Sequence, residues 1–243
     1  MSQIPKSIAA FAAELAKSHD IDAVVLGGSH AVNTADPESD WDLGVYYRGA
    51  IDLSKLASYG EVHPPGSWGR IMNGGAWLDF DGVRVDVLLR DLNTVEHWTR
   101  LAEQGKFEVD SLLGYVAGIP SYTLTAELAS CRILHGDLPV VSYPTKLIES
   151  GPHVWRFCRN FSLDYAYKHA KRGNLVGATA QAARAVVEEA HAIMCERGAW
   201  VCNEKRLIES AGLDRIQELF AELPSETAPL TKWLDRIRKT IRQ

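Results

Sequence analysis

A glycine turn and a pair of aspartates constrain this chain more than any other feature. The apolar run that begins at Asp22 stops at Gly27-Gly28-Ser29, which is the pattern of a buried strand ending in a tight turn. Ten residues separate this turn from Asp40-Trp41-Asp42, which opens a second strand pattern that runs to Tyr47. Successive side chains of a strand point to opposite faces, so we predict both carboxylates on one face and Trp41 on the other.

Three carboxylates in strand patterns indicate a divalent metal site. Two carboxylates as close as Asp40 and Asp42 repel one another unless a cation lies between them, and divalent ions bind oxygen ligands. Asp86 lies in another apolar strand pattern, where an unpaired charge is costly to bury. If the two strands are neighbours, Asp40, Asp42 and Asp86 can hold two metal ions about 3.5–4 Å apart. That arrangement serves in-line phosphoryl and nucleotidyl displacement.

The glycine turn supplies contacts for phosphate. Gly28 lets the backbone approach a phosphate closely, because glycine has no side chain. The hydroxyl of Ser29 and the first N–H groups of a following helix can donate to the β- and γ-phosphate oxygens. Together with the carboxylates, the turn predicts an enzyme that handles a nucleoside triphosphate. A P-loop and a serine hydrolase elbow are excluded, because neither of their motifs occurs in the sequence.

The first half of the chain mixes helix and strand patterns. Besides the two strands above, we expect a helix over 7–18, a helical turn over 29–34, a loop over 36–39, strands over 77–80 and 83–89, and a helix over 91–104. Asp81-Gly82 between the last two strands is a strong hairpin signal. Gly105 is the expected C-cap of the last helix.

Strand patterns stop near residue 120. Helices are expected over 125–134, 154–172, 175–197, 204–211, 214–223 and 229–241, and Pro139, Pro144 and Pro152 mark the change. We therefore predict an α+β protein with two domains. Residues 1–120 form a catalytic domain with a short mixed sheet flanked by helices, and residues 121–243 form an antiparallel helical bundle.

Charge and composition narrow the class of protein. The net charge is −5, but residues 1–120 carry 9 Lys and Arg against 17 Asp and Glu, whereas residues 121–243 carry 17 against 14. An acidic half needs metal before a triphosphate can approach, and without a dense basic stripe we do not expect a nucleic-acid partner. The sequence has no long apolar run and no signal-peptide pattern, so we expect no membrane partner and a cytoplasmic location. Four cysteines without metal-site spacing are expected to be buried, reduced thiols: Cys131, Cys158, Cys195 and Cys202.

The two motifs resemble those of the DNA polymerase β-type nucleotidyltransferase superfamily. The stretch from Gly28 to Asn33 is similar to the Gly-Ser-x-Ala-Arg-Gly of its small bacterial members, such as aminoglycoside and lincosamide nucleotidyltransferases, and Ser39-Asp40-Trp41-Asp42-Leu43 is similar to their Ser-Asp-x-Asp-Leu. Val32-Asn33 replaces the frequent Arg-Gly, so an arginine contact with phosphate is not implied at this turn. Residues 74–92 and 200–205 resemble uncharacterised bacterial nucleotidyltransferase-domain proteins.

The resemblance implies a chemistry and its cofactors. It implies Mg²⁺, with two ions expected, bound by Asp40, Asp42 and Asp86, and an NTP donor, with ATP expected, seated at Gly28 and Ser29. It also implies that the helical domain completes the acceptor side. Whether the protein is a monomer or a homo-oligomer is left open by these motifs.

Further side chains are candidates for the site. Glu108 is the candidate general base, because a carboxylate near the acceptor hydroxyl can take its proton. The alternatives for that role are Asp86, Glu127 and Glu204. Lys168 and Lys205 are candidates for nucleotide binding, although a solvated helix face and a helix start after Asn203 explain them equally well. Four aromatic residues can stack on a base or an acceptor, or else pack in the core: Trp68, Trp77, Tyr46 and Tyr47.

Three functions are compatible with these motifs. The leading hypothesis is a Mg²⁺-dependent enzyme that moves NMP, with AMP expected, from an NTP to a hydroxyl of a small molecule, for example an antibiotic, and releases pyrophosphate. The second keeps this chemistry but has a protein or tRNA as acceptor, as in toxins. The third is a non-catalytic nucleotide-binding protein on the same fold.

Overall fold

The computed structural model describes residues 4–36, 39–80 and 82–242, so Pro37, Glu38 and Asp81 of the expected loop and hairpin lie outside the described residues. The chain packs as two compact units. One comprises Met1–Leu101 with Pro120–Ser142, and the other comprises Ala102–Ile119 with Tyr143–Gln243. Residues 121–142, which the sequence-based division places in the helical half, therefore pack with the sheet.

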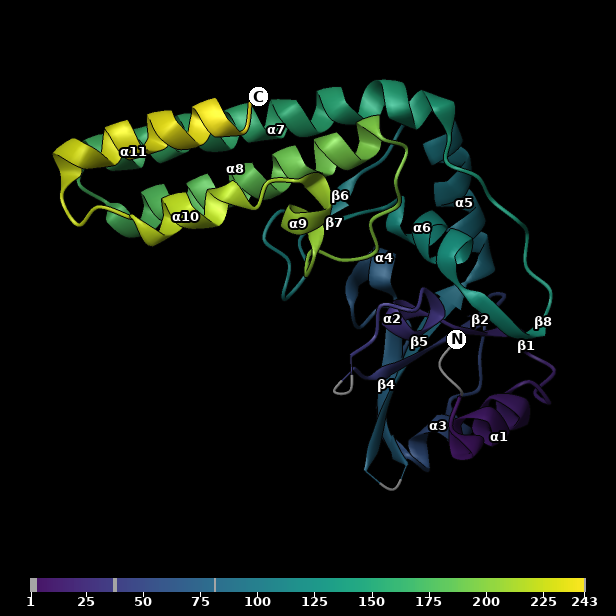
Figure 1. Cartoon of the computed structure of the whole chain (residues 1–243). Helices are drawn as coiled ribbons and strands as arrows, with labels where there is room; N and C mark the ends of the chain where they lie inside the picture. The colour runs from purple at the N-terminus through teal and green to yellow at the C-terminus, as the bar shows by residue number, and fades with distance from the viewer. Residues whose placement is uncertain (1–3, 37–38, 81, 243) are drawn as a thin grey trace. The chain divides into compact units, whose positions relative to one another are not determined.

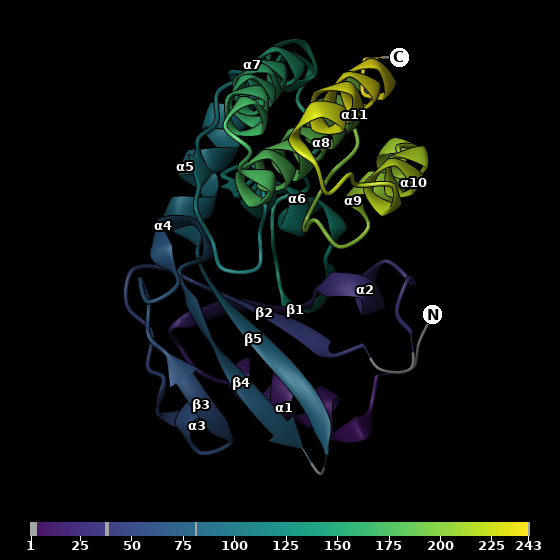
Figure 2. The same cartoon turned by 90° about the vertical axis from the view of Figure 1, so that its left-hand side faces the viewer.

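The first unit is built on a mixed six-stranded sheet (Figure 2). Its strands are β1 (Ile21–Leu26), β2 (Trp41–Tyr47), β3 (Gly60–His63), β4 (Gly74–Phe80), β5 (Val83–Asp91) and β8 (Arg132–Gly136). They are ordered β3-β4-β5-β2-β1-β8. Only β2 and β5 pair in parallel, and the other neighbours are antiparallel. The α+β class and the mixed sheet predicted from the sequence are confirmed.

One face of this sheet forms the core of the unit. Alternate residues of β2 and β5, such as Leu43, Val45, Val85 and Val87, are fully buried on it. They pack with helix α1 (Lys6–Leu15), which presents Ile8, Phe11, Ala12 and Leu15 to the same cluster. The period of two in the strands and the helical spacing in α1 produce this layer directly. The opposite face of β2 and β5 is thus left for the polar residues of the alternation.

Short elements complete the sheet unit. They are α2 (Gly28–Ala31), α3 (Ser54–Ala57), α4 (Gly69–Met72), α5 (Leu92–Glu103) and α6 (Thr123–Ser130). The strands β6 (Val109–Asp110) and β7 (Ile119–Pro120) form a separate two-stranded pair, and β6 belongs to the other unit. Gly105 follows α5 with φ of 74°, as expected of a C-cap. The strand β3 and the helices α3 and α4 were not predicted, because they are too short to show a period.

The helix predicted over 125–134 is wrong at its end. Helix α6 stops at Ser130, and Cys131 is extended before β8 begins at Arg132. Strand β8 pairs antiparallel with β1, which is more than a hundred residues earlier in the chain. A short apolar run such as Arg132–Leu134 does not distinguish helix from strand, and a distant partner decided between them.

The second unit is an antiparallel helical bundle (Figure 1). Its helices are α7 (Thr145–Lys171), α8 (Leu175–Glu196), α9 (Leu207–Ala211), α10 (Arg215–Ala221) and α11 (Thr227–Thr240). A short connection capped by Asn174, whose side chain accepts from the N–H of Gly177 at 2.9 Å, turns α7 into α8. Buried alanines, including Ala166, Ala170 and Ala178, let the two helices approach closely.

Pro152 does not end a helix, although proline is expected to do so. It lies inside α7, although proline removes the hydrogen bond to the carbonyl four residues earlier. Gly151 and Pro152 are buried, and a side chain at Gly151 would come within 2.9 Å of the sulfur of Cys195 on α8. Close packing between α7 and α8 therefore compensates for the weakened helix.

The remaining structural expectations concern thiols and membranes. None of the four cysteines, all of them described, forms a disulfide bond; Cys195 is buried, whereas Cys131, Cys158 and Cys202 are half-buried. No helix in the described part of the chain is long and apolar enough to cross a bilayer.

Candidate active site

Asp42 and Asp86 are partners on neighbouring strands. Strands β2 and β5 run parallel, and their register pairs Asp42 with Asp86. Register partners point to the same face of a sheet, so both carboxylates leave the sheet on the face opposite the apolar core. Both residues are half-buried. The strand adjacency that the metal hypothesis required is therefore present.

Asp40 precedes β2 by one residue and shares the parity of Asp42. Its side chain is 42% exposed, and one carboxylate oxygen lies 4.0 Å from Nη1 of Arg84. Arg84 belongs to β5, two residues before Asp86, and its side chain is 78% exposed. Such an open ion pair adds little stability. Arg84 is thus placed to screen the carboxylates.

The glycine turn after β1 is fitted against Asp42. Gly28 has φ of 55°, and a Cβ at this position would lie 1.7 Å from Oδ2 of Asp42. The N–H of Gly27 donates to the carbonyl of Asp42 at 2.8 Å. Only glycine fits at position 28, because any side chain would occupy the space of the carboxylate. The turn and Asp42 therefore form one local structure.

His30 fixes the turn from the other side, a role that the sequence did not reveal. Its ring stacks on Trp41, with centroids 3.7 Å apart and planes at 7°, and its Nε2 lies 3.3 Å from the carbonyl oxygen of Ser39. Both rings are buried. The stack ties the short helix α2, which carries Ser29, to the start of β2. In the sequence, this role is indicated only by the position of His30 directly after Gly28-Ser29.

The donor set of this site fits a divalent metal in its chemistry. Asp40, Asp42 and Asp86 offer carboxylate oxygens on one face, and hard cations such as Mg²⁺ prefer such ligands. Within residues 4–36, 39–80 and 82–242, no three His, Cys, Asp or Glu side chains are grouped as tightly as a bound ion needs.

Comparison with known proteins identifies the part of the chain that carries this site. Residues 7–108 match the family model of the nucleotidyltransferase domain. The chain contains a nucleotidyltransferase domain. The matched range includes the glycine turn and all three aspartates, and it confirms the family expected from the motifs. None of the curated proteins matches the chain.

Two solved structures are similar to this chain, both at low identity. A nucleotidyltransferase-like protein from Exiguobacterium sibiricum 255-15 is 13% identical, with a TM-score of 0.49 over 96% of this chain and 72% of that chain. An aminoglycoside 6-adenyltransferase from Bacillus subtilis is 11% identical, with a TM-score of 0.28 over 97% of this chain and 90% of that chain. At these values, neither similarity bears on the substrate of this nucleotidyltransferase.

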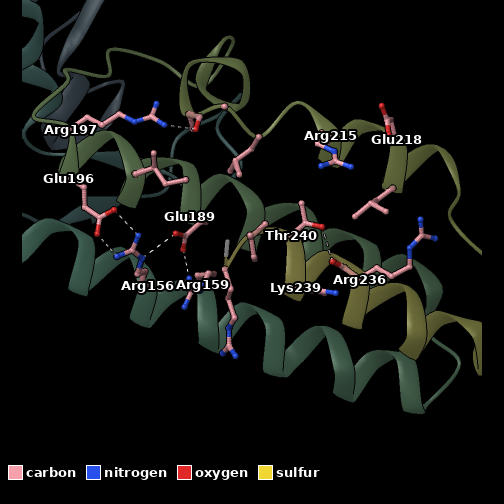
Figure 3. A pocket seen from close by; sticks show the side chains of 17 residues that line it. Arg156, Arg159, Glu189, Glu196, Arg197, Arg215, Glu218, Arg236, Lys239 and Thr240 are labelled. Carbon is pink, nitrogen blue, oxygen red and sulfur yellow. Dashed lines mark hydrogen bonds and ion pairs between the residues drawn. The ribbon is translucent and has the colours of Figure 1, made fainter.

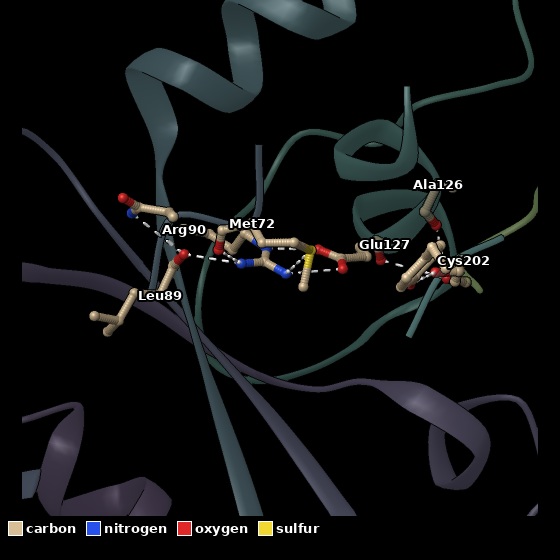
Figure 4. Close-up of polar contacts among 9 residues, drawn as sticks. Met72, Leu89, Arg90, Ala126, Glu127 and Cys202 are labelled. Carbon is tan, nitrogen blue, oxygen red and sulfur yellow. Dashed lines mark hydrogen bonds and ion pairs between the residues drawn. The ribbon is translucent and has the colours of Figure 1, made fainter. Parts of the chain in front are cut away.

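Glu127 is engaged in a structural ion pair and is not available as a general base. Arg90 of β5, which is 1% exposed, donates from Nε and Nη2 to the two oxygens of Glu127 on α6, at 2.6 and 2.8 Å (Figure 4). Arg90 also donates from Nη1 to the carbonyl of Met72 at 2.8 Å. The ion pair thus connects β5 and α4, which lie in the matched domain, with α6, which follows it in the chain.

Glu204 likewise has a structural partner set. Its carboxylate accepts from the N–H groups of Val116 and Ala117 at 2.5 and 2.9 Å, within the helical unit. Burial raises the pKa of Glu204, but these hydrogen bonds and the neighbouring His191 outweigh it, so the pKa lies below its ordinary value. The carboxylate stays ionised and clamps the segment before β7. It is not a candidate base.

The other predicted site residues lie in the second unit. Glu108 is exposed and directly precedes β6. Lys168 is exposed on α7, where its Nζ lies 4.3 Å from the centre of the Tyr165 ring. Lys205 is exposed, and its backbone N–H donates to the Asn203 side chain at 3.0 Å, two residues before α9 begins at Leu207. Roles for these three side chains stay predictions.

The predicted aromatic residues separate into two groups. Tyr46 and Tyr47 are each 1% exposed, so they pack in the sheet unit and cannot stack on a ligand. Trp77 is 50% exposed, and Trp68 is half-buried. Only the two tryptophans therefore keep the ligand-binding interpretation.

A cavity of about 1160 Å³ lies within the helical unit (Figure 3). Its wall includes Arg156, which pairs with Glu189 at 3.1 Å and Glu196 at 2.5 Å, and the buried Arg159, which also pairs with Glu189. Further cations line it: Arg197, Arg215, Arg236, Lys239 and Arg242. Ion pairs between α7 and α8 therefore contribute to its wall, and none of the predicted site residues is among the described residues of that wall.

Proposed function

We propose that this nucleotidyltransferase moves a nucleoside monophosphate from an NTP, with ATP as the expected donor, to a hydroxyl of a small molecule. Pyrophosphate is the second product. The observation that supports the proposal is the register pair of Asp42 and Asp86, with the Gly28 turn packed against Asp42. The glycine turn and two of the carboxylates are thus neighbours, which supports phosphate and metal binding at one place.

Each side chain has a distinct part in the proposed reaction. Asp40, Asp42 and Asp86 would hold Mg²⁺, which when bound supplies charge to the oxygens around the α-phosphorus. Gly28 leaves room for phosphate next to Asp42, and the hydroxyl of Ser29 donates to it. Arg84 screens the carboxylates when no nucleotide is bound.

The bonds change in one in-line displacement. The acceptor oxygen forms a bond to the α-phosphorus, the bond from that phosphorus to the bridging oxygen breaks, and pyrophosphate leaves with the bonding electrons. The acceptor proton passes to a carboxylate. Asp86 is the candidate within the sheet unit, and Glu108 is the candidate in the other unit.

Transfer of label from α-labelled ATP in the presence of Mg²⁺ tests the proposal. Asp42→Asn removes one metal ligand, and we expect at least a hundredfold loss of labelled product. Asp137→Asn is the matched control, because Asp137 is an exposed carboxylate of the same unit outside the register pair. Equal transfer by Asp42→Asn and the wild-type protein would contradict nucleotidyl transfer at this site.

A further inference from the structure

The face that carries the carboxylates continues to an exposed tryptophan. Asp42 on β2 pairs in register with Asp86 on β5, and Asp86 pairs in register with Trp77 on β4. Register partners share a face, so these side chains form a line across three adjacent strands. The Gly28 turn lies at the Asp42 end of this line. Trp77 lies at the other end.

The order of the side chains from Asp42 to Trp77 indicates from which side the acceptor approaches. This step rests on the proposed function. In an in-line displacement, the leaving and attacking oxygens stand on opposite sides of the phosphorus. Pyrophosphate seated at Gly28 and Ser29 leaves toward the Asp42 end. The attacking hydroxyl therefore approaches from the Asp86 end, where Trp77 is the next side chain.

Trp77 belongs to a preformed aromatic cluster. Its ring centre lies 4.3 Å from that of His63 and 5.7 Å from that of Trp68, and the latter two are 5.0 Å apart. His63 is the register partner of Gly75, and a Cβ at Gly75 would come within 2.5 Å of the Trp68 ring. The glycine thus lets Trp68 lie on the sheet beside Trp77. Half of Trp77 stays exposed, although its neighbours hold it in place.

The charges around this cluster limit what can bind. Glu61 is the register partner of Trp77 and is 68% exposed in its side chain, and Asp79 follows on the same face of β4. With the carboxylates of the line, they make this end of the face acidic. His63 lies 3.6 Å from Glu61, and Arg84 is the register partner of Asp79. A negatively charged acceptor would be repelled. A cation, in contrast, gains from both the carboxylates and the indole ring.

We propose that Trp77, supported by Trp68 and His63, is the acceptor-binding surface of this enzyme. It takes a ring of a neutral or positively charged hydroxyl compound, stacked so that the hydroxyl reaches over Asp86. Trp77 therefore determines which acceptors are used and leaves the donor half of the reaction unchanged.

Kinetics with simple acceptors test this role in the full-length protein. Glucosamine serves as a cationic ring, methyl glucoside as a neutral ring, glucose 6-phosphate as an anionic ring and glycerol as an acceptor without a ring. Formation of nucleotidylated product from α-labelled ATP is measured for the wild-type protein, Trp77→Ala and Trp77→Phe. Tyr59→Ala is the matched control, because Tyr59 is 45% exposed but packs with Phe11 on the other face of the sheet.

We expect the wild-type protein to prefer glucosamine and methyl glucoside over glycerol and glucose 6-phosphate. Trp77→Ala should lower kcat/KM for the preferred rings about tenfold, the equivalent of one stacked ring. Trp77→Phe should retain most of it. The KM for ATP, and the slow cleavage of ATP by water, should stay within about twofold of the wild-type values, as should every value for Tyr59→Ala.

Other outcomes would overturn the assignment. A higher KM for ATP in Trp77→Ala would place the nucleotide base on Trp77. Three results would show that Trp77 is not the acceptor-binding surface. They are equal use of glycerol and the ring compounds, a preference for glucose 6-phosphate, and no transfer to any ring compound. A second measurement is an NMR titration with glucosamine that follows the chemical shift of the indole N–H of Trp77. An unchanged chemical shift would count against the proposal. Asp42→Asn shows whether the proposed function itself has failed. If this variant cleaves ATP as fast as the wild-type protein, the carboxylate site does not act on ATP, whatever the result for Trp77.

Discussion

Gly28 shows how one residue couples conformation to chemistry. Its φ of 55° lies in the region that favours glycine, and its missing side chain leaves the space that Oδ2 of Asp42 occupies. Two separate requirements therefore meet at this position. The first is the backbone turn after β1, and the second is room for a carboxylate and a phosphate.

Gly28→Ala should abolish transfer from α-labelled ATP, with a loss of at least a hundredfold, because the methyl group displaces Asp42. Gly49→Ala is the matched control, since Gly49 has φ of 73° and nothing lies within 4 Å of its Cβ position. Both variants carry backbone strain of about 1–2 kcal/mol. If both lose activity equally, strain explains the effect and the carboxylate contact does not.

His191 is a buried titratable residue in the helical unit. It is 1% exposed, it stacks on Trp155 with ring centres 4.3 Å apart, and its Nε2 lies 3.8 Å from Glu204. Neither ring nitrogen has a hydrogen-bond partner in the described part of the chain. Burial lowers the pKa of His191, and the nearby Glu204 only partly opposes this.

The free energy of unfolding should therefore fall as pH decreases below about 6.5, the pKa of histidine in the unfolded chain. The unfolded state binds a proton there, whereas the folded state keeps His191 neutral. Denaturant unfolding between pH 5 and 8 measures the slope. His191→Phe should flatten it, and the exposed His19→Gln should not. A steeper loss of stability at high pH would contradict the neutral buried state.

At the scale of elements, a buried ion pair joins the sheet to α6. Arg90 and Glu127 lie 37 residues apart, and their bidentate contact connects β5 with the helix that leads into β8. Arg90 is almost fully buried, and the Glu127 carboxylate and the carbonyls of Met72 and Leu89 accept hydrogen bonds from its guanidinium group. Breaking such a pair leaves a buried charge without compensation.

Glu127→Gln should lower the free energy of unfolding by about 3 kcal/mol. Chemical denaturation followed by circular dichroism measures the change. Glu14→Gln is the control, since Glu14 pairs with Lys17 and Lys55 at the surface and we expect no resolvable effect. If Glu127→Gln lowers the free energy of unfolding no more than Glu14→Gln does, water compensates the charge of Arg90 in place of Glu127.

At the scale of the whole molecule, the chain enters the sheet unit twice. Residues 1–101 supply five strands, and residues 120–142 return to add β8 beside β1. The intervening residues 102–119 pack with the helical unit. Neither unit is therefore a continuous stretch of sequence.

A fragment of residues 1–120 should fail to fold cooperatively, because it exposes the edge of β1 and leaves Arg90 without Glu127. A fragment of residues 1–142 restores both and should be more stable. Thermal unfolding and size-exclusion chromatography of the two fragments compare them. A fragment 1–120 that unfolds cooperatively at the same temperature as fragment 1–142 would show that β8 is dispensable.

Much of the local structure follows from the sequence alone. The bounds of β2, the hairpin strands β4 and β5, α5 and α8 agree with prediction within a few residues, because apolar periodicity and glycine turns act over short distances. The same local patterns pointed to Asp40, Asp42 and Asp86. They also led to the nucleotidyltransferase domain that the family comparison confirms.

Long-range packing decided the rest. The sequence by itself determined which residues form strands with carboxylates and which form amphipathic helices. Only the tertiary structure paired Asp86 with both Asp42 and Trp77, and only it added β8 to the edge of β1. It also kept α7 helical at Pro152 and brought Glu127 to Arg90. The physical reason is that each of these depends on a partner distant in the chain, whose contribution no local pattern contains.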